Sequence, residues 1–370
     1  MIIANCARAL AAILVGAALA AAPASAQDFK AEWAKLVAAA EQEASLIVFA
    51  QPNSAARGYV QAAWSKSFPK IALQLIVMPN PQFIARIRTE RGAGKYLWDV
   101  AFTGYTAGYV LYKEDAIDPL MPELIDPDVK KPELWGGWDE AFVDNQKKYV
   151  FSMSAFIKGA FYNALHIPPE RIAREGFKVM LDPALKGKLV WHDPAIPGSG
   201  QTFPHMLKTR LGDEGLRKIV LDQQIVWVAQ QHMVVEALVR GTAWIGMGPA
   251  VTGLLGQYKD AGVKLDIRGF GNSPEVNDMS IGGSSMYVFN KRPHPAAARV
   301  FVNWILTREN QYGLAKAQDQ NSRRRDVPSI AGPDETARSG AKYVEVQREQ
   351  YQAELLGAVK LASELRKQVK

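Results

Sequence analysis

The sequence predicts an α/β fold in which helices cover both faces of largely parallel sheets. Short continuous apolar runs, typical of strands buried on both faces, alternate along the chain with segments of helical period. The chain has 370 residues, enough for two lobes of ordinary domain size. These observations together predict two α/β lobes.

The first part of the chain contains three strand-like runs, each next to a helical segment. The predicted elements are, in order, a helix over 29–40, a strand over 46–50, a helix over 59–68, a strand over 73–78, a helix near 83–87 and a strand over 99–102. Pro69 ends the second of these helices, and Gly92 and Gly94 close the third. This order is typical of a sheet with helices on both faces.

The rest of the chain repeats the alternation. The predicted elements are strands over 149–154, 159–163, 189–191, 243–247 and 285–289, a helix beginning near Gln201 and a helix over 296–307. Residues from about Thr336 onward are polar and helical in pattern, with a broken apolar stripe. We expect this extension to pack back on the body of the protein. The alternative is a tail that binds a partner.

The first 26 residues have the features of a secretory signal peptide. Arg8 precedes an apolar run over 9–22, and Ala24-Ser25-Ala26 is a small-residue cleavage site. The run is too short to span the bilayer comfortably, which disfavours a membrane anchor. We expect cleavage near Ala26 and a periplasmic mature protein.

Charge and cysteine content exclude several classes of function. The net charge is +7, but the basic residues are scattered, so a nucleic-acid-binding face is not expected. A basic protein still favours anionic small molecules. Cys6 is the only cysteine and precedes the apolar run, so we expect no lipid anchor, disulfide or thiolate site in the mature chain.

Five segments together resemble a known family. They are 46–50 with its polar loop, Trp-Asp-Val-Ala-Phe at 98–102, Phe-Tyr-Asn at 161–163, Leu-Asp-Pro-Ala-Leu-Lys-Gly-Lys-Leu-Val at 181–190, and 294–311, which begins His-Pro-Ala-Ala-Ala. In this order and spacing, over nearly all of the mature chain, they resemble the bacterial extracellular solute-binding proteins grouped with ferric-iron, thiamine and spermidine/putrescine binders.

The resemblance implies the type II periplasmic-binding-protein fold, with two lobes joined by two crossover strands. Lobe 1 would comprise 27–155 and 284–335, lobe 2 would comprise 156–283, and 336–370 would be a helical extension on lobe 1. The crossovers would lie near Ser154 and Ser284. The implied function is that of the solute-binding component of an ABC importer, a monomer without a cofactor, which closes on a solute and delivers it to the permease.

In open α/β sheets, ligands bind beyond the carboxyl ends of the strands. This rule selects polar and small residues from two loops in each lobe, and the family has its ligand contacts in matching loops. They are Gln51, Pro52, Asn53, Ser54, Thr103, Gly104 and Tyr105 in lobe 1, and Ser199, Gly200, Gln201, Thr202, Gly248, Pro249 and Ala250 in lobe 2.

The loop at 197–202 has two explanations. Its small residues can expose backbone N–H groups at a helix start, where a carboxylate or phosphonate would bind. The alternative is ordinary N-capping by Ser199. Asn321, Ser322 and Arg323 would add a hydrogen-bonding or cationic edge to the ligand site, or form a solvated basic turn. Tyr105 is a candidate for the ligand surface or for simple packing.

A small organic anion is the expected ligand, with a ferric ion or ferric complex as the alternative. Ferric binders in this group carry adjacent tyrosines after the strand that matches 243–247, where this chain has Gly248-Pro249-Ala250. The histidines have no metal-binding spacing, so no metal site is expected. A secreted hydrolase is a further alternative, but G-x-S-x-G and H-E-x-x-H are absent and no catalytic residue is assigned. A sensory binder coupled to a receptor would share the same lobes.

Overall fold

The computed structural model describes residues 24–51, 53–196, 199–248, 255, 258, 261–271, 277–280, 284–318, 320–330, 332, 336 and 343–369. The expected signal peptide therefore lies almost entirely outside the described residues, and α1 (Ala24–Glu43) begins at the expected cleavage site. Among the described helices, none combines the length and apolar character needed to cross a membrane.

The first lobe is built on a mixed sheet with the strand order β2-β1-β3-β13-β4, in which β5 also pairs with β13. Its strands are β1 (Ser45–Ala50), β2 (Ala72–Ile76), β3 (Val100–Thr103), β4 (Ile117–Asp118), β5 (Phe151–Ser152) and β13 (Ser285–Phe289). β1 runs parallel to β2 and β3, and β13 runs antiparallel to β3. The predicted strand at 46–50 is thus confirmed in the interior of this sheet, between β2 and β3.

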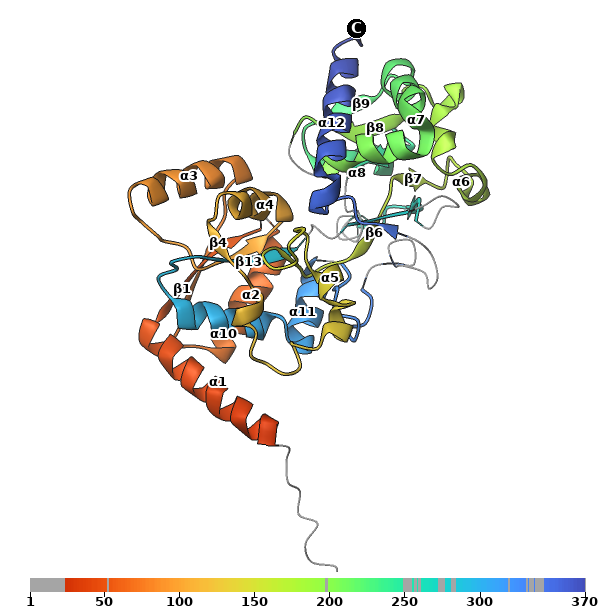
Figure 1. The fold of residues 1–370 in the computed structure, drawn as a ribbon. Coiled ribbons are helices and arrows are strands. Elements are labelled where there is room, and N and C mark those ends of the chain that lie inside the picture. Colours follow the sequence, from red (N-terminus) through yellow and green to blue (C-terminus); the bar gives the residue numbers. More distant parts are fainter. Residues whose placement is uncertain are drawn as a thin grey trace, which may run out of the picture.

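Helices cover both faces of this sheet, as predicted (Figure 1). Its helices are α1, α2 (Ser54–Ser67), α3 (Asn80–Gly92), α4 (Tyr105–Lys113), α5 (Trp138–Ala141), α10 (Pro295–Ile305) and α11 (Arg308–Gln318), with the short helices η1 (Met121–Glu123) and η2 (Pro132–Trp135). Leu46 and Val48 of β1 face a core shared with α1, α2 and α10, whereas Phe49 faces α3 and α4. Because successive side chains point to opposite faces, a strand buried on both sides is apolar throughout.

The second lobe has a sheet of its own with the order β11-β7-β10-β8-β9. Its elements are β7 (Phe161–Asn163), α6 (Pro169–Glu175), η3 (Gly176–Leu181), η4 (Pro183–Leu185), β8 (Leu189–His192), η5 (Ser199–Thr202), α7 (Phe203–Asp222), β9 (Val226–Val228), α8 (Gln231–Val239), β10 (Ile245–Met247) and β11 (Ile267–Gly269). α7 covers one face and α8 the other, each with its own apolar core. The chain is therefore two-lobed, as predicted.

A small third sheet joins the lobes. It consists of β6 (Phe156–Lys158), β12 (Asn277–Ser280) and β14 (Tyr343–Val344), with β12 in the middle. The chain leaves the first lobe through β6 and returns through β12, close to the predicted crossover positions. There the backbone N–H of Ser284 donates to Oγ of Ser154 over 3.1 Å. β14 adds a third crossing, which the sequence did not reveal.

The C-terminal extension differs from its prediction. It is not continuously helical: β14 is followed by η7 (Glu349–Tyr351), and α12 begins only at Gln352 and ends at Arg366. The helix packs against α7 of the second lobe, not on lobe 1 as expected (Figure 1). The reason is its apolar stripe: Leu355, Ala358, Ala362 and Leu365 are buried, and Leu365 joins the core of the second lobe.

Candidate functional site

The predicted residues of the first lobe lie together at the carboxyl ends of β1 and β3. These strands are parallel neighbours, and the backbone N–H of Gln51 donates to the carbonyl of Phe102 over 2.8 Å. Thr103 ends β3 and is buried, and Gly104 and Tyr105 begin α4. This brings the loop after β1 beside the loop after β3, as the strand-end rule predicts.

Asn53 and Gln51, both in the loop after β1, differ in their hydrogen bonding. Asn53 is the N-cap of α2, and its Oδ1 accepts from the N–H of Ala56 over 3.0 Å, while Ser54 is exposed. Gln51 is only 6% exposed, and its Nε2 has no hydrogen-bond partner among the described residues. An unpaired buried amide is costly, so a ligand is one group that could complete it. Pro52 lies outside the described residues.

The loops of the second lobe gather around His192, which ends β8. The N–H of Gly200 donates to Nδ1 of His192 over 3.2 Å, and Oγ of Ser199 lies 3.4 Å from the same atom. Because a backbone amide can only donate, Nδ1 is the acceptor, and Nε2 carries the hydrogen that points to the carbonyl of Ala229 over 3.3 Å. Sequence reasoning gave His192 no role, since a lone histidine has no informative spacing.

Close packing explains the small residues of these loops. A Cβ on Gly200 would lie 1.9 Å from the carbonyl oxygen of His192, and one on Gly248 would lie 2.7 Å from Cβ of His192. Gly248 also has φ of 117°, which favours glycine. The loop with Gly200 follows β8, and Gly248 follows β10. Because β8 and β10 are parallel neighbours, the two loops meet at one edge of the sheet. Pro249 and Ala250 lie outside the described residues.

The start of α7 argues against N-capping by Ser199 as the explanation for the loop at 197–202. Ser199 does not cap α7: the N-cap is Thr202, which makes no side-chain capping bond. Thr202 is 4% exposed, and its Oγ1 has no partner among the described residues. Gln201 lies half-buried in the same short helix, η5. The predicted loops of the second lobe therefore resemble those of the first in containing a buried polar atom with no partner among the described residues.

Residues Tyr343 to Gln352, which we call the strap, connect the two lobes beside these loops. Glu349 forms an ion pair with Lys113 of α4 and accepts from the N–H of Asn145 over 2.8 Å. Tyr105 is hydrogen-bonded to Gln352, and burial raises its pKa. α12, which begins at Gln352, also contacts η5. The strap thus connects the surroundings of Tyr105 to those of Thr202.

The structure places Asn321, Ser322 and Arg323 in a different setting. They line a cavity of about 570 Å³, the hinge cavity, together with Ala155, Met279 and part of the strap. The described lining includes none of the strand-end loop residues. Oγ of Ser322 donates to Oε1 of Gln311 over 2.7 Å, so it is engaged within the protein. Among the described residues, Asn321, Ser322 and Arg323 are therefore not seen beside the strand-end loops, where they were expected to add a polar edge.

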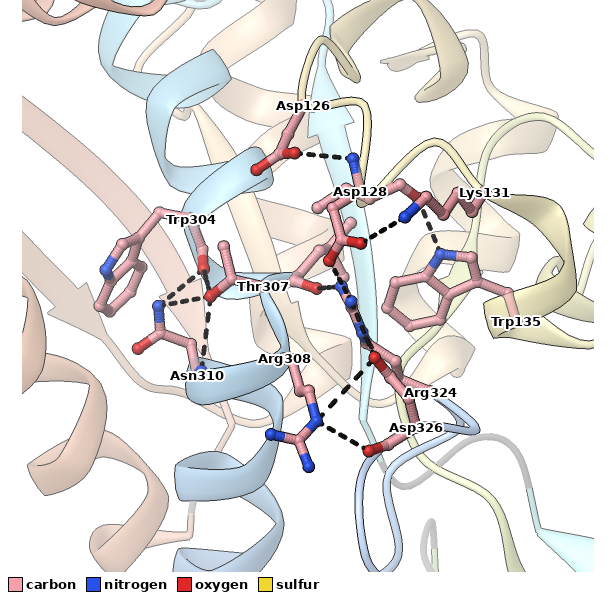
Figure 2. Close-up of polar contacts among 12 residues, drawn as sticks. Asp126, Asp128, Lys131, Trp135, Trp304, Thr307, Arg308, Asn310, Arg324 and Asp326 are labelled. Carbon is pink, nitrogen blue, oxygen red and sulfur yellow. Dashed lines mark hydrogen bonds and ion pairs between the residues drawn. The ribbon is translucent and has the colours of Figure 1, made fainter. Parts of the chain in front are cut away.

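The basic run at 323–325 is not a solvated turn. Arg323 is 8% exposed and bonds to Oε1 of Glu345 through both terminal nitrogens at 3.0 Å. Arg324 is 1% exposed, and Figure 2 shows it between Asp128 and Asp326. Arg325 alone is exposed. Three adjacent arginines therefore have three different environments, which composition cannot reveal.

Metal-binding groups are sparse in the described part of the chain. Within it, no three histidine, cysteine, aspartate or glutamate side chains lie together as candidate metal ligands. His205 of α7 contacts Glu354 of α12 over 3.4 Å. The donors at the strand ends are instead amide and hydroxyl groups, which suit an organic ligand or an anion.

Comparison with solved structures supports the fold. The iron-bound HitA structure from Pseudomonas aeruginosa aligns with 88% of this chain and 98% of its own, at 16% identity and a TM-score of 0.62. The Trichodesmium protein IdiA (FutA), with iron and citrate, aligns over 87% and 99%, at 16% identity and a TM-score of 0.66. AfuA from Actinobacillus pleuropneumoniae, with fructose-6-phosphate, aligns over 88% and 97%, at 15% identity and a TM-score of 0.58.

Sequence comparison gives a more direct assignment. No curated protein matches the chain. The family model of the bacterial extracellular solute-binding proteins, however, matches residues 23–327, which include both lobe sheets and the first two crossings. On this match, the chain belongs to the bacterial extracellular solute-binding protein family.

Proposed function

We propose that this protein captures a small organic anion between its two lobes in the periplasm and delivers it to the permease of an ABC importer. One observation carries the choice of site. Among the described residues, the predicted loops of each lobe contain a buried polar atom without a partner, Nε2 of Gln51 and Oγ1 of Thr202. Leaving such an atom unpaired costs about 1–3 kcal/mol, which a ligand with a matching acceptor would recover.

The chemistry of these loops favours an acceptor-rich ligand. Gln51 offers an N–H, and Thr202 and Ser199 offer hydroxyl groups, while the predicted loops contain no acidic side chain. The net charge of +7 adds a weak general attraction for anions. Citrate and fructose-6-phosphate, present in two of the similar structures, are both organic anions.

Hinge closure is the mechanism that we propose for capture. The lobes are joined by short strands, an arrangement that permits rotation of one lobe against the other. Closure would bring ligand contacts from both lobes together and expel water. A micromolar dissociation constant requires about 8 kcal/mol of net binding free energy, which a few desolvated polar contacts and some apolar burial can supply.

A ligand screen tests this function directly. The purified protein is screened by thermal shift against carboxylates, phosphonates, polyamines, thiamine and ferric salts, and each hit is followed by small-angle scattering. An organic anion should raise the melting temperature, because a ligand at a hundred times its Kd stabilises by about 2.7 kcal/mol. It should also lower the radius of gyration. A shift with ferric salts alone, or binding without compaction, would contradict the proposal.

Thr202→Val provides a prediction that separates function from structure. Because Oγ1 of Thr202 has no partner among the described residues, the change should leave stability unchanged or raise it by up to about 1 kcal/mol. Affinity for the screened ligand should nevertheless fall about five- to tenfold. Denaturant unfolding and calorimetric titration measure the two effects.

Thr209→Val is the matched control on the same helix. Oγ1 of Thr209 donates to backbone oxygens of α7, with His205 at 2.9 Å and Met206 at 3.0 Å. Its removal should alter stability slightly and leave affinity unchanged. Equal affinity in the wild type and Thr202→Val would remove Thr202 from the proposed site.

A further inference from the structure

Among the described residues that line the hinge cavity, positive charges outnumber negative ones. Three arginines line it, Arg323, Arg325 and Arg348, against two acids, Glu140 and Glu345. Both acids are engaged: Glu345 pairs with Arg323 and Arg348, and Glu140 pairs with Arg348 over 2.8 Å. Within this described lining, one positive charge therefore remains.

Arg325 carries that remaining charge. No acidic or carbonyl oxygen of the described residues pairs with its guanidinium. The side chain lies over Gly136, where a Cβ would come within 2.8 Å of Nη2. Gly136 has φ of 86° and no side chain, so it leaves room for the guanidinium at the cavity wall. An exposed arginine at the wall of a cavity is suited to a carboxylate or phosphate.

A second observation points to a ligand in the same cavity. Nε of Arg323 has no hydrogen-bond partner among the described residues, although Arg323 is 8% exposed. The burial that isolates this nitrogen also lowers the pKa of Arg323. An anion nearby would offset that cost, because charge interactions are stronger in a partly desolvated site.

We propose that the hinge cavity is a second ligand site, for a small organic anion whose carboxylate or phosphate group pairs with Arg325 and Arg323. Its volume of about 570 Å³ suits a small organic molecule. Trp135 and Tyr351 contribute aromatic surface to the walls, which favours a ligand with a flat apolar part. This site is separate from the strand-end loops of the proposed import function.

The position of the cavity gives a bound anion access to the joint between the lobes. Its wall includes Ala155 beside β6, Met279 of β12 and Val344 of β14, so all three crossings meet there. A ligand in contact with all three crossings has different contacts in the open and closed forms if the lobes rotate. Such a difference is what allows a ligand to shift a conformational equilibrium.

Chemical labelling tests the site at residue resolution. Phenylglyoxal modifies accessible guanidinium groups, and peptide mass spectrometry reports each arginine separately. Phenyl phosphate and phthalate are the probes, and benzyl alcohol is the neutral control. At saturation, either anion should slow the labelling of Arg325 about fivefold or more, and benzyl alcohol should not. Arg217, exposed on α7, should be labelled at the same rate with or without probe.

Two charge-matched variants complete the test. Arg325→Gln should weaken phenyl phosphate binding roughly ten- to a hundredfold in calorimetric titration, as expected for a lost charge-assisted hydrogen bond. Arg217→Gln, with the same change in net charge, should bind like the wild type. If neither anion protects Arg325, or if Arg325→Gln binds phenyl phosphate as tightly as the wild type, the second site does not exist.

Discussion

Replacing Gly200 by alanine is expected to weaken ligand binding about a hundredfold and to destabilise the protein. The new Cβ would lie 1.9 Å from the carbonyl oxygen of His192, a backbone atom that cannot move aside cheaply. The loop must shift, which breaks the bond from the N–H of Gly200 to Nδ1 of His192 and displaces Thr202. Losing about 2–3 kcal/mol of polar contacts corresponds to that change in affinity. The overpacking itself costs about 1–3 kcal/mol of folding free energy.

Gly58→Ala is the matched control for this prediction. Gly58 lies in α2, and a Cβ there would meet no atom within 4 Å. Alanine in a helix should raise stability by roughly 0.5–1 kcal/mol and leave binding unchanged. Titration with the ligand found by the screen, together with denaturant unfolding, measures both quantities. If Gly200→Ala binds as tightly as Gly58→Ala, the loop at 199–202 is not part of the ligand site.

The fold could be predicted because its strands are buried on both faces. The run at 46–50 is apolar at every position since Val48 and Phe49 enter cores on opposite sides of the sheet. The strand-end rule then selected loops that the structure brings together in pairs: Gln51 lies beside β3, and Gly248 packs against His192. Local pattern was sufficient for these features because each depends on a strand and its immediate neighbours.

The strap could not be predicted from local pattern. Periodicity over its residues gives a helical signal, because it merges with α12. The strand β14 exists only through its pairing with β12, at Asn277 and Asp278, more than sixty positions earlier in the chain. Glu349 and Gln352 acquire their roles from Lys113 and Tyr105 in the same way. Long-range pairing of this kind overrides the local preference.

Sequence pattern groups residues 321–323 with the strand-end loops, whereas in the structure they line the hinge cavity. Asn, Ser and Arg are typical of ligand edges, and here several of their polar atoms meet protein groups. Oδ1 of Asn321 accepts from the N–H of Ile330 over 2.7 Å, and Arg323 binds Glu345. Residue type alone does not distinguish a buried structural network from a binding surface. Arg324, in the next position, is the clearest example of a charged residue that is part of a buried structural network.

Replacing Arg324 by methionine is expected to lower the free energy of unfolding by about 3–4 kcal/mol. The side chain is buried, and its Nε and Nη2 bond to Asp326 at 2.8 and 3.1 Å, while Nη1 donates to the carbonyl of Leu306 over 2.9 Å (Figure 2). It also forms an ion pair with Asp128. Methionine keeps much of the volume but leaves the buried carbonyl without this donor and removes the Arg324 cation from two carboxylates, Asp128 and Asp326. Denaturant unfolding at neutral pH measures the loss.

The pH dependence of this loss distinguishes the ion pairs from simple packing. Hydrogen bonds from Arg324, and then from Lys131, hold the pKa of Asp128 below its usual value. A carboxylate with a lowered pKa stabilises the fold above its unfolded pKa of about 4, and this contribution disappears as the pH falls through the folded value. The gap between the wild type and Arg324→Met should therefore narrow below about pH 4.

Arg308→Met serves as the control, because Arg308 also contacts Asp326 but is 61% exposed. An exposed pair contributes little, so this variant should stay within about 0.5 kcal/mol of the wild type at every pH. A loss for Arg324→Met that stays constant from pH 7 to pH 3 would attribute its role to packing against Trp135. If both variants lost the same free energy of unfolding, the burial of Arg324 would add nothing to stability. The loop at 321–327 would then be held by other contacts.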